Sequence, residues 1–235
     1  MEITVCETSD DNFWKDWPKI AENSGDIVLL PELPAYPWFP RYPKFDERIW
    51  NEALKAHDHL IAKLEEITVV STRPIEQRLN QAFLWNGEYV PIRSKYYMPN
   101  EEGFYERKWF KRGDREVKVV EWNGIRLGVL ICSEVFFQEL AREYAKLGVH
   151  LIFVPRATHS IRKWLIALKM TAIVSGAFVA SSNRYGNGFS GRGWVISPEG
   201  EVIASTSRIR RFVTVNIDMD KAEIAKQKYP RTLWS

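Results

Sequence analysis

The stretch Gly128-Val129-Leu130-Ile131-Cys132-Ser133-Glu134 marks the point where an expected strand meets an expected helix. Residues 125–131 form a short apolar run with branched side chains, and this run follows the turn-forming pair Asn123-Gly124. Such a run predicts a buried strand. Residues 134–147 carry apolar side chains at helical spacing and end before Gly148, which is typical of a glycine-capped helix. Cys132 is therefore expected where a strand turns into a helix.

The expected position of Cys132 allows two interpretations. A cysteine at a strand end lies above the edge of the sheet, where the N–H groups of the following helix favour its thiolate form. Alternatively, Cys132 is a small apolar residue of the core, which is the more common role of a lone cysteine. The rest of the chain bears on this choice.

The other segments predict an α/β protein built in layers, because helix-like stretches occur between strand-like ones. The apolar run at 26–30 is typical of a strand covered on both faces. Asn86-Gly87 and Asn123-Gly124 predict tight hairpins. Helices are expected at 10–21 after Asp10 or Asp11, after the cap Asp46, at 134–147, and after Ser160. The remaining strands are expected at 2–6, 67–71, 81–85, 89–93, 117–122, 151–154, 177–181, 193–197, 201–205 and 212–217, and residues 221–235 are too mixed to assign.

Composition limits the class of protein. With 235 residues, 45% of them hydrophobic, residues 1–235 are expected to form one domain with a large core. The net charge of +3 is small beside 33 basic and 30 acidic side chains, and no basic stripe predicts a nucleic-acid partner. No apolar stretch reaches the roughly 20 residues that span a bilayer. No membrane partner is therefore expected. Two cysteines in a chain of this size indicate a reducing, cytoplasmic setting.

Three expected strand ends each carry a reactive side chain. Glu32 follows the strand at 26–30, Lys95 follows the hairpin strand at 89–93, and Cys132 precedes a helix. Each residue alone is more often a solvated charge or a core residue. Together they supply a cysteine nucleophile with a base and a fixed cation. His57 and His59 lie two residues apart in one expected helix and make a poor metal pair. Catalysis by a cysteine with a base and a cation needs no metal or organic cofactor, so none is expected.

The order and spacing of these segments resemble the nitrilase (carbon–nitrogen hydrolase) superfamily. The resemblance rests on Leu30-Pro31-Glu32, Arg93-Ser94-Lys95 and Gly128–Cys132, and it extends to residues 148–155, 181–184 and 193–200. It covers nearly all of Asp26 to Ile217. This resemblance implies a four-layer α-β-β-α sandwich of the nitrilase type, paired through a helical layer into homodimers or larger homo-oligomers.

The same resemblance implies roles for individual residues. Cys132 is the expected nucleophile, Glu32 the general base and acid, and Lys95 the cation that stabilises the tetrahedral oxyanion. The backbone N–H of Ser133 is the expected second oxyanion donor. The run Gly103-Phe104-Tyr105-Glu106 resembles carbamoyl-cleaving members and selects Glu106 as the second glutamate. Its neighbours Glu101 and Glu102 are interpreted as a solvated loop.

The implied activity is hydrolysis of an amide or N-carbamoyl substrate through a thioester, which releases ammonia or amine and a carboxylic acid. Nitrile hydrolysis by the same residues and a non-catalytic scaffold remain alternatives.

The chain departs from commoner family patterns at three places: Tyr97-Met98, Ser133-Glu134 and Arg156. Arg156 either binds a substrate carboxylate or pairs with Glu134. Tyr36, just beyond the general base, is expected to line the substrate pocket.

Overall fold

A computed structural model describes residues 1–233, in which 13 strands form one continuous hydrogen-bonded sheet. The strands are β1 (Glu2–Ser9), β2 (Ile27–Leu29), β3 (Val69–Ile75), β4 (Leu79–Trp85), β5 (Tyr89–Ser94), β6 (Val120–Trp122), β7 (Ile125–Val129), β8 (Leu151–Arg156), β9 (Phe178–Gly186), β10 (Phe189–Ser190), β11 (Trp194–Ile196), β12 (Val202–Ser205) and β13 (Phe212–Asn216). The helices are α1 (Phe13–Glu22), α2 (Glu47–Ile61), α3 (Glu106–Trp109), α4 (Gln138–Lys146), α5 (Arg162–Ser175) and α6 (Asp220–Lys226), with 3₁₀ turns η1 (Phe39–Arg41), η2 (Cys132–Phe136) and η3 (Arg231–Leu233).

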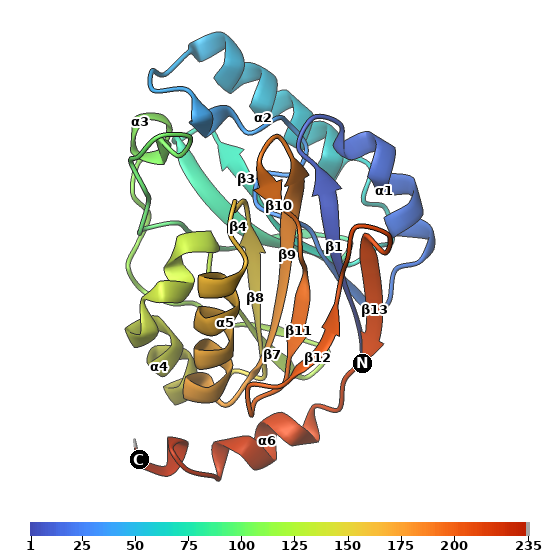
Figure 1. The fold of residues 1–235 in the computed structure, drawn as a ribbon, viewed down its shortest axis with the longest axis vertical. Helices are drawn as coiled ribbons and strands as arrows, with labels where there is room; N and C mark the ends of the chain where they lie inside the picture. The colour runs from blue at the N-terminus through green and yellow to red at the C-terminus, as the bar shows by residue number, and fades with distance from the viewer. Residues whose placement is uncertain (234–235) are drawn as a thin grey trace.

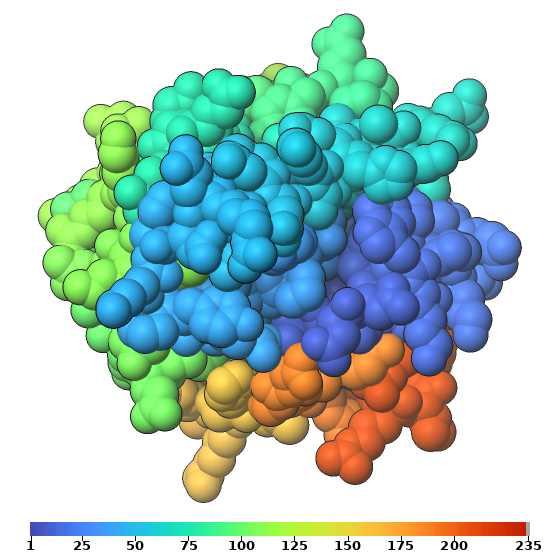
Figure 2. All heavy atoms as spheres, turned by 90° about the horizontal axis from the view of Figure 1, so that it is seen from above, coloured from blue at the N-terminus to red at the C-terminus, as the bar shows by residue number. Residues whose placement is uncertain are grey.

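The main path through the sheet runs β5-β4-β3-β2-β1-β9-β8-β7-β6. Its two halves meet where the last residues of β1 pair in parallel with β9. Helices α1 and α2 cover the half that contains β1–β5, and α4 and α5 cover the half that contains β7–β9 (Figure 1). Figure 2 shows the first quarter of the chain, in blue, lying against the orange segments near residue 190.

Two apolar clusters fill the spaces between these layers. One cluster combines side chains of both sheet halves, such as Val5 and Leu29 with Val129 and Phe153, and continues beneath α4 and α5. The other packs α1 and α2 onto the outer face of the first half. The order of layers is therefore helix, sheet, sheet, helix, which confirms the expected α-β-β-α sandwich.

Several local predictions are confirmed. The Asp46 carboxylate caps α2 by accepting the N–H groups of Arg48 and Ile49 at 2.9 and 3.1 Å. Asn86-Gly87 joins β4 to β5, and Asn123-Gly124 joins β6 to β7. The unassigned stretch at 221–235 contributes most of α6 and the turn η3.

Other boundaries differ from the predicted ones. The helix expected at 134–147 is divided into the 3₁₀ turn η2 and the separate helix α4. The Glu134 side chain accepts the Ile131 N–H and tightens the first turn, and Phe137 then leaves the helical region with φ −96° and ψ 85°. No side chain caps α1 or α5, so Asp10, Asp11 and Ser160 all lack the expected capping role.

No helix within residues 1–233 is long and apolar enough to cross a membrane.

Candidate active site

Strand direction brings the candidate catalytic residues to one edge of the sheet. β2 and β3 are parallel, and two antiparallel steps through β4 give β5 the same direction as β3. Glu32 and Lys95 therefore follow strands that end at the same edge, and Cys132 follows the parallel strand β7 of the other half. Carboxyl ends of parallel strands are the usual place for sites in open α/β sheets.

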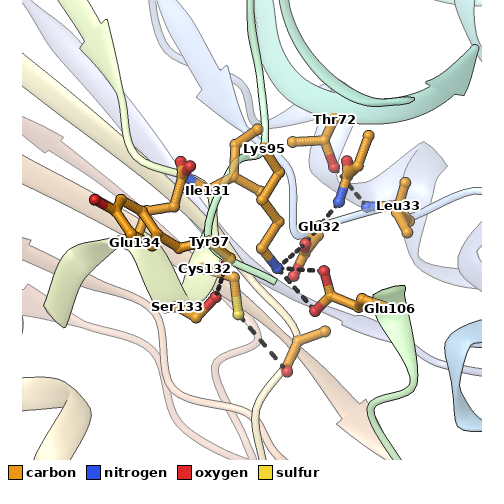
Figure 3. A network of polar contacts seen from close by, with 12 residues as sticks. Glu32, Leu33, Thr72, Lys95, Tyr97, Glu106, Ile131, Cys132, Ser133 and Glu134 are labelled. Atoms are coloured by element: carbon orange, nitrogen blue, oxygen red, sulfur yellow. Dashed lines mark hydrogen bonds and ion pairs between the residues drawn. The ribbon is translucent and has the colours of Figure 1, made fainter. Parts of the chain in front are cut away.

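Four of the predicted residues lie together at this edge: Glu32, Lys95, Glu106 and Cys132 (Figure 3). Their exposed fractions are only 0%, 0%, 1% and 4%. The Lys95 Nζ atom lies 2.8 Å from Glu32 Oε1 and 2.8 Å from Glu106 Oε1. The prediction that places Glu106, rather than Glu101 or Glu102, beside the lysine agrees with this geometry.

Lys95 is held as a cation by its two carboxylates. Burial alone lowers the pKa of Lys95, but Glu106 and Glu32 outweigh that effect and raise it above the ordinary lysine value. The ammonium group therefore holds its proton more tightly than that of an ordinary lysine. As a cation, Lys95 can stabilise a developing negative charge.

The two oxygens of Glu32 have different surroundings. Oε1 accepts both the Lys95 ammonium and the Asn80 side-chain amide, each at 2.8 Å. Oε2 is buried and has no hydrogen-bond partner within residues 1–233. This oxygen can accept a proton without breaking an existing contact. Sequence reasoning missed Asn80, because its position opposite the glutamate depends on the register between β3 and β4.

A buried ion pair fixes the loop that carries Glu32. Arg184 donates from Nε to the Glu32 carbonyl at 3.0 Å and also to the Leu33 carbonyl, and it pairs with Asp10 at 2.7 Å. Thr72 Oγ1 accepts the Leu33 N–H at 3.0 Å, and Leu33 has a φ of 50°. Arg184 lies in a segment that carried the family resemblance, yet the sequence assigned it no role.

Cys132 has a strained backbone and an enclosed thiol. Its φ is 50°, in the left-handed region, and its Sγ atom lies 3.9 Å from the Ala157 carbonyl oxygen. Burial raises the pKa of the Cys132 thiol well above its usual value, and Glu32 raises it further against the opposing effect of Lys95. Burial therefore opposes the thiolate form that a position before a helix favours. The segment at Cys132 is only the short turn η2, and attack by the sulfur requires a base to take its proton.

Glu106 has a pKa close to the working range. Burial raises the pKa of this carboxyl to about 8, because Glu32 adds to the effect while Lys95 only partly offsets it. Below about pH 8 Glu106 is protonated and neutral. Above about pH 8 Glu106 carries a negative charge, which opposes the charge that develops on sulfur and oxygen during attack.

We therefore expect kcat/KM to fall as the pH rises through about 8, and we expect Glu106→Gln to remove this fall. Glutamine keeps a hydrogen-bonding oxygen for Lys95 but cannot ionise. The measurement is kcat/KM between pH 6 and 10 for both proteins. A fall with the same midpoint in the glutamine variant contradicts the assignment of this ionisation to Glu106.

A cavity of about 490 Å³ opens above the cysteine. Glu106, Cys132 and Ser133 contribute to its lining, and Ala157, Thr158, Ser160 and Pro99 add to it. The other lining residues are aromatic (Phe104, Phe136, Trp164), charged (Glu101, Glu102, Lys163) or an imidazole (His159). A second cavity, of about 550 Å³, lies between α1 and β13 and is lined by none of the four catalytic candidates. The first cavity is therefore the candidate substrate pocket.

Two of the three predicted substrate contacts lie elsewhere. Ser133 lines the cavity, and its hydroxyl donates to the Tyr97 carbonyl at 2.7 Å. Tyr36 lies outside the lining and donates its hydroxyl proton to Glu52 at 2.6 Å. Arg156 also lies outside it.

Arg156 does not pair with Glu134 in the structure. The guanidinium is turned toward β9 and β11, where it donates to Ser181, to Thr158 at 3.1 Å and to the Arg192 carbonyl, and lies over Trp194. Glu134 pairs with Arg93 instead. Burial lowers the pKa of Arg156 to about 9. The side chain of this last residue of β8 points between strands rather than into the cavity, so pairing with Glu134 is a wrong prediction.

A family model described as carbon–nitrogen hydrolase matches residues 11–227. The chain belongs to this family. Among curated relatives, the glutamine-dependent NAD(+) synthetase of Aquifex aeolicus is 28% identical over 212 residues, which are 84% of this chain and 37% of that protein. The N-carbamoylputrescine amidase of Solanum lycopersicum is 27% identical over 158 residues, 58% of this chain and 53% of that one. The chain thus spans about a third to a half of these relatives.

Solved structures share the fold of this carbon–nitrogen hydrolase family member. A carbon–nitrogen hydrolase from Helicobacter pylori G27 has a TM-score of 0.85 at 19% identity, covering 99% of this chain and 94% of that one. A mutant amidase from Nesterenkonia sp. AN1, which shows Michael addition of acrylamide at its active-site cysteine, has a TM-score of 0.78 at 23% identity. That comparison covers 100% of this chain and 98% of the amidase. The resemblance inferred from the sequence is confirmed.

Proposed function

We propose that this protein hydrolyses the C–N bond of a small amide or N-carbamoyl compound through a thioester on Cys132. The observation that carries the proposal is the buried set in which Lys95 lies 2.8 Å from Glu32, while the second Glu32 oxygen has no hydrogen-bond partner within residues 1–233. Membership of the carbon–nitrogen hydrolase family supports the reaction class. The amidase and N-carbamoylputrescine amidase among the similar proteins support the choice of substrate class.

In the first stage the free oxygen of Glu32 takes the proton of the Cys132 thiol as sulfur bonds to the substrate carbonyl carbon. The carbonyl oxygen becomes an anion, which the Lys95 ammonium and the Ser133 N–H stabilise. One well-placed oxyanion donor contributes about 3–4 kcal/mol to barrier lowering. Glu32 then gives its proton to the nitrogen, the C–N bond breaks, and ammonia or amine leaves a thioester behind.

The second stage uses the same groups in reverse. Glu32 takes a proton from water as the water oxygen bonds to the thioester carbon. The resulting oxyanion again faces Lys95. The C–S bond breaks, the carboxylic acid leaves, and Glu32 returns its proton to the Cys132 sulfur. Each proton taken is given back, so the enzyme is regenerated and the net reaction consumes one water. Glu106 holds Lys95 in place throughout.

The cavity gives the proposed substrate its general character. Phe104, Phe136 and Trp164 form apolar walls, so the acyl or amine portion is expected to carry an aliphatic or aromatic group.

Two free cysteines support a cytoplasmic setting. We also propose that the protein acts as a single domain and as a homodimer or larger homo-oligomer. The exposed apolar residues Ile166 and Met170 of α5 support self-association through the helical layer.

The test is a screen for ammonia release from aliphatic and aromatic amides, N-carbamoyl amines and the nitriles of matching size. The blank is the Cys132→Ala variant. We expect release from at least one amide or carbamoyl compound, at a rate far above the blank and above that of the matching nitrile. Ammonia release from nitriles alone contradicts the proposed amide or N-carbamoyl substrate and indicates nitrile hydrolysis instead. Turnover that is equal in the blank contradicts the role of the cysteine.

A further inference from the structure

Glu134 makes an unusual set of contacts next to the nucleophile. Its carboxylate is fully buried and lies beside Ile131 (Figure 3). One oxygen accepts the Ile131 N–H at 2.9 Å, and the other accepts the Tyr96 N–H at 2.9 Å. Ile131 directly precedes Cys132, and Tyr96 directly follows Lys95. One side chain thus binds the backbone next to Cys132 and also the backbone next to Lys95.

Arg93 completes this contact set from β5. Its guanidinium donates to both oxygens of Glu134 and, at 3.5 Å, to the Val129 carbonyl at the end of β7. Both side chains of the ion pair are buried. Because Arg93 is two residues before Lys95, the pair joins the end of β5 to the end of β7.

No strand pairing connects these two ends within the described chain. β5 lies at one end of the main sheet path, and β7 lies near the other end, in the second half of the sandwich. The separation between the Lys95 ammonium and the Cys132 sulfur therefore depends on contacts across the two halves. The Arg93–Glu134 pair supplies such a contact at the level of the backbone.

The same carboxylate also closes the turn that strains Cys132. The Glu134 N–H donates to the Ile131 carbonyl at 3.1 Å while its side chain accepts the Ile131 N–H. A left-handed conformation of a non-glycine residue costs about 1–2 kcal/mol and persists only where its surroundings enforce it. These reciprocal bonds enforce the conformation that exposes the Cys132 sulfur to the cavity.

We propose that Glu134 is a positioning residue that, with Arg93, sets the distance and direction between Cys132 and Lys95. This inference rests on the proposed function, which gives those two residues their roles. Glu134 is absent from the lining of the cavity, and its two oxygens are already occupied by Arg93 and by the backbone N–H groups of Ile131 and Tyr96. It acts through the backbone of Ile131 and Tyr96. A buried ion pair adds little stability over apolar residues of similar size, which agrees with a role in geometry.

Glu134→Gln tests the proposal while keeping the shape of the side chain. Glutamine has one carbonyl oxygen, so at least one of the two backbone N–H groups loses its acceptor, and Arg93 loses its counter-ion. A misplacement of about 1 Å costs roughly 100-fold in rate. We expect kcat to fall about 100-fold while KM changes less than about threefold, because the cavity walls are untouched.

Glu7→Gln is the matched control. Glu7 is 2% exposed, pairs with Arg211 at 2.9 Å and accepts the Arg192 N–H at 2.9 Å, outside the catalytic cavity. We expect Glu7→Gln to lower Tm about as much as Glu134→Gln and to change kcat less than about twofold. Equal kcat losses in the two variants, or an unchanged kcat in Glu134→Gln, overturn the proposal.

Two further arms keep the test decisive. If Glu134→Gln does not fold, Arg93→Lys takes its place, because lysine keeps the charge but cannot bind both oxygens as a fork. Its expected kcat loss is about tenfold, and an unchanged kcat overturns the proposal.

If the wild type hydrolyses no C–N substrate, the proposed function fails, and crystal structures decide the inference. A Cys132 Sγ shift of about 1 Å in Glu134→Gln, but not in Glu7→Gln, supports it. The same sulfur position in both overturns it.

Discussion

Cys132→Ala is expected to reduce turnover of any C–N substrate by roughly 10⁵-fold or more, as removal of a catalytic nucleophile does in well-studied hydrolases. The reason is that no other thiol can reach the substrate. Cys6, the other cysteine, is fully buried and its Sγ atom donates to the Leu29 carbonyl at 3.3 Å. Steady-state rates of ammonia release, with Tm measured for each protein, test this expectation.

Cys6→Ala is the matched control for the nucleophile. Burial raises the pKa of the Cys6 thiol, which keeps it unreactive. Replacing it removes one thiol from the core at a cost of about 1–2 kcal/mol of stability and leaves the cavity intact. We expect its turnover to stay within about twofold of wild type. Turnover that survives in Cys132→Ala, or disappears in Cys6→Ala with the fold intact, contradicts the assignment.

Glu32→Gln is expected to lower kcat by about 10³–10⁴-fold, the upper part of the range for a general acid and base. The effect is large because the same carboxylate moves a proton in both stages. Glutamine is isosteric with glutamate, and Glu106 remains within 2.8 Å of the Lys95 ammonium, so the site is expected to keep its shape.

Asn80→Leu gives the comparison for Glu32. It removes a neutral donor to the bonded oxygen and leaves the free oxygen in place. We expect a kcat loss of about ten- to a hundredfold, since one hydrogen bond to a charged group contributes about 1.5–3 kcal/mol. The measurement is kcat for both variants. A smaller loss of kcat in Glu32→Gln than in Asn80→Leu contradicts the role of Glu32 as the proton carrier.

The sequence predicted layers of helix and sheet and placed Glu32, Lys95 and Cys132 at strand ends because these features leave local signals. Glu32 follows a strand that Pro31 ends, and Lys95 and Cys132 each follow a strand-like run with its own turn signal. Strand direction then brings such positions to one edge. Glu106 required the resemblance to carbamoyl-cleaving members, since it lies in a polar loop and begins only the short helix α3.

The contacts that hold these residues left no such signal. Asn80 reaches Glu32 through strand register, and Arg93 meets Glu134 across the two halves of the sheet. The sequence left the ionisation of Cys132 open, because the pKa of its thiol depends on burial and on Glu32, which the helix-end argument did not include. Arg156 was misplaced because the direction of a side chain at a strand end depends on its neighbours in the sheet.

Mass spectrometry of the quenched reaction tests the central claim most directly. Wild-type protein is mixed with an amide or carbamoyl substrate, stopped with acid within the first turnovers, and digested. The account predicts an acyl or carbamoyl adduct on the peptide that contains Cys132, which disappears as the acid product accumulates and is absent from Cys132→Ala. Turnover without any adduct on Cys132, or an adduct on another residue, would contradict it.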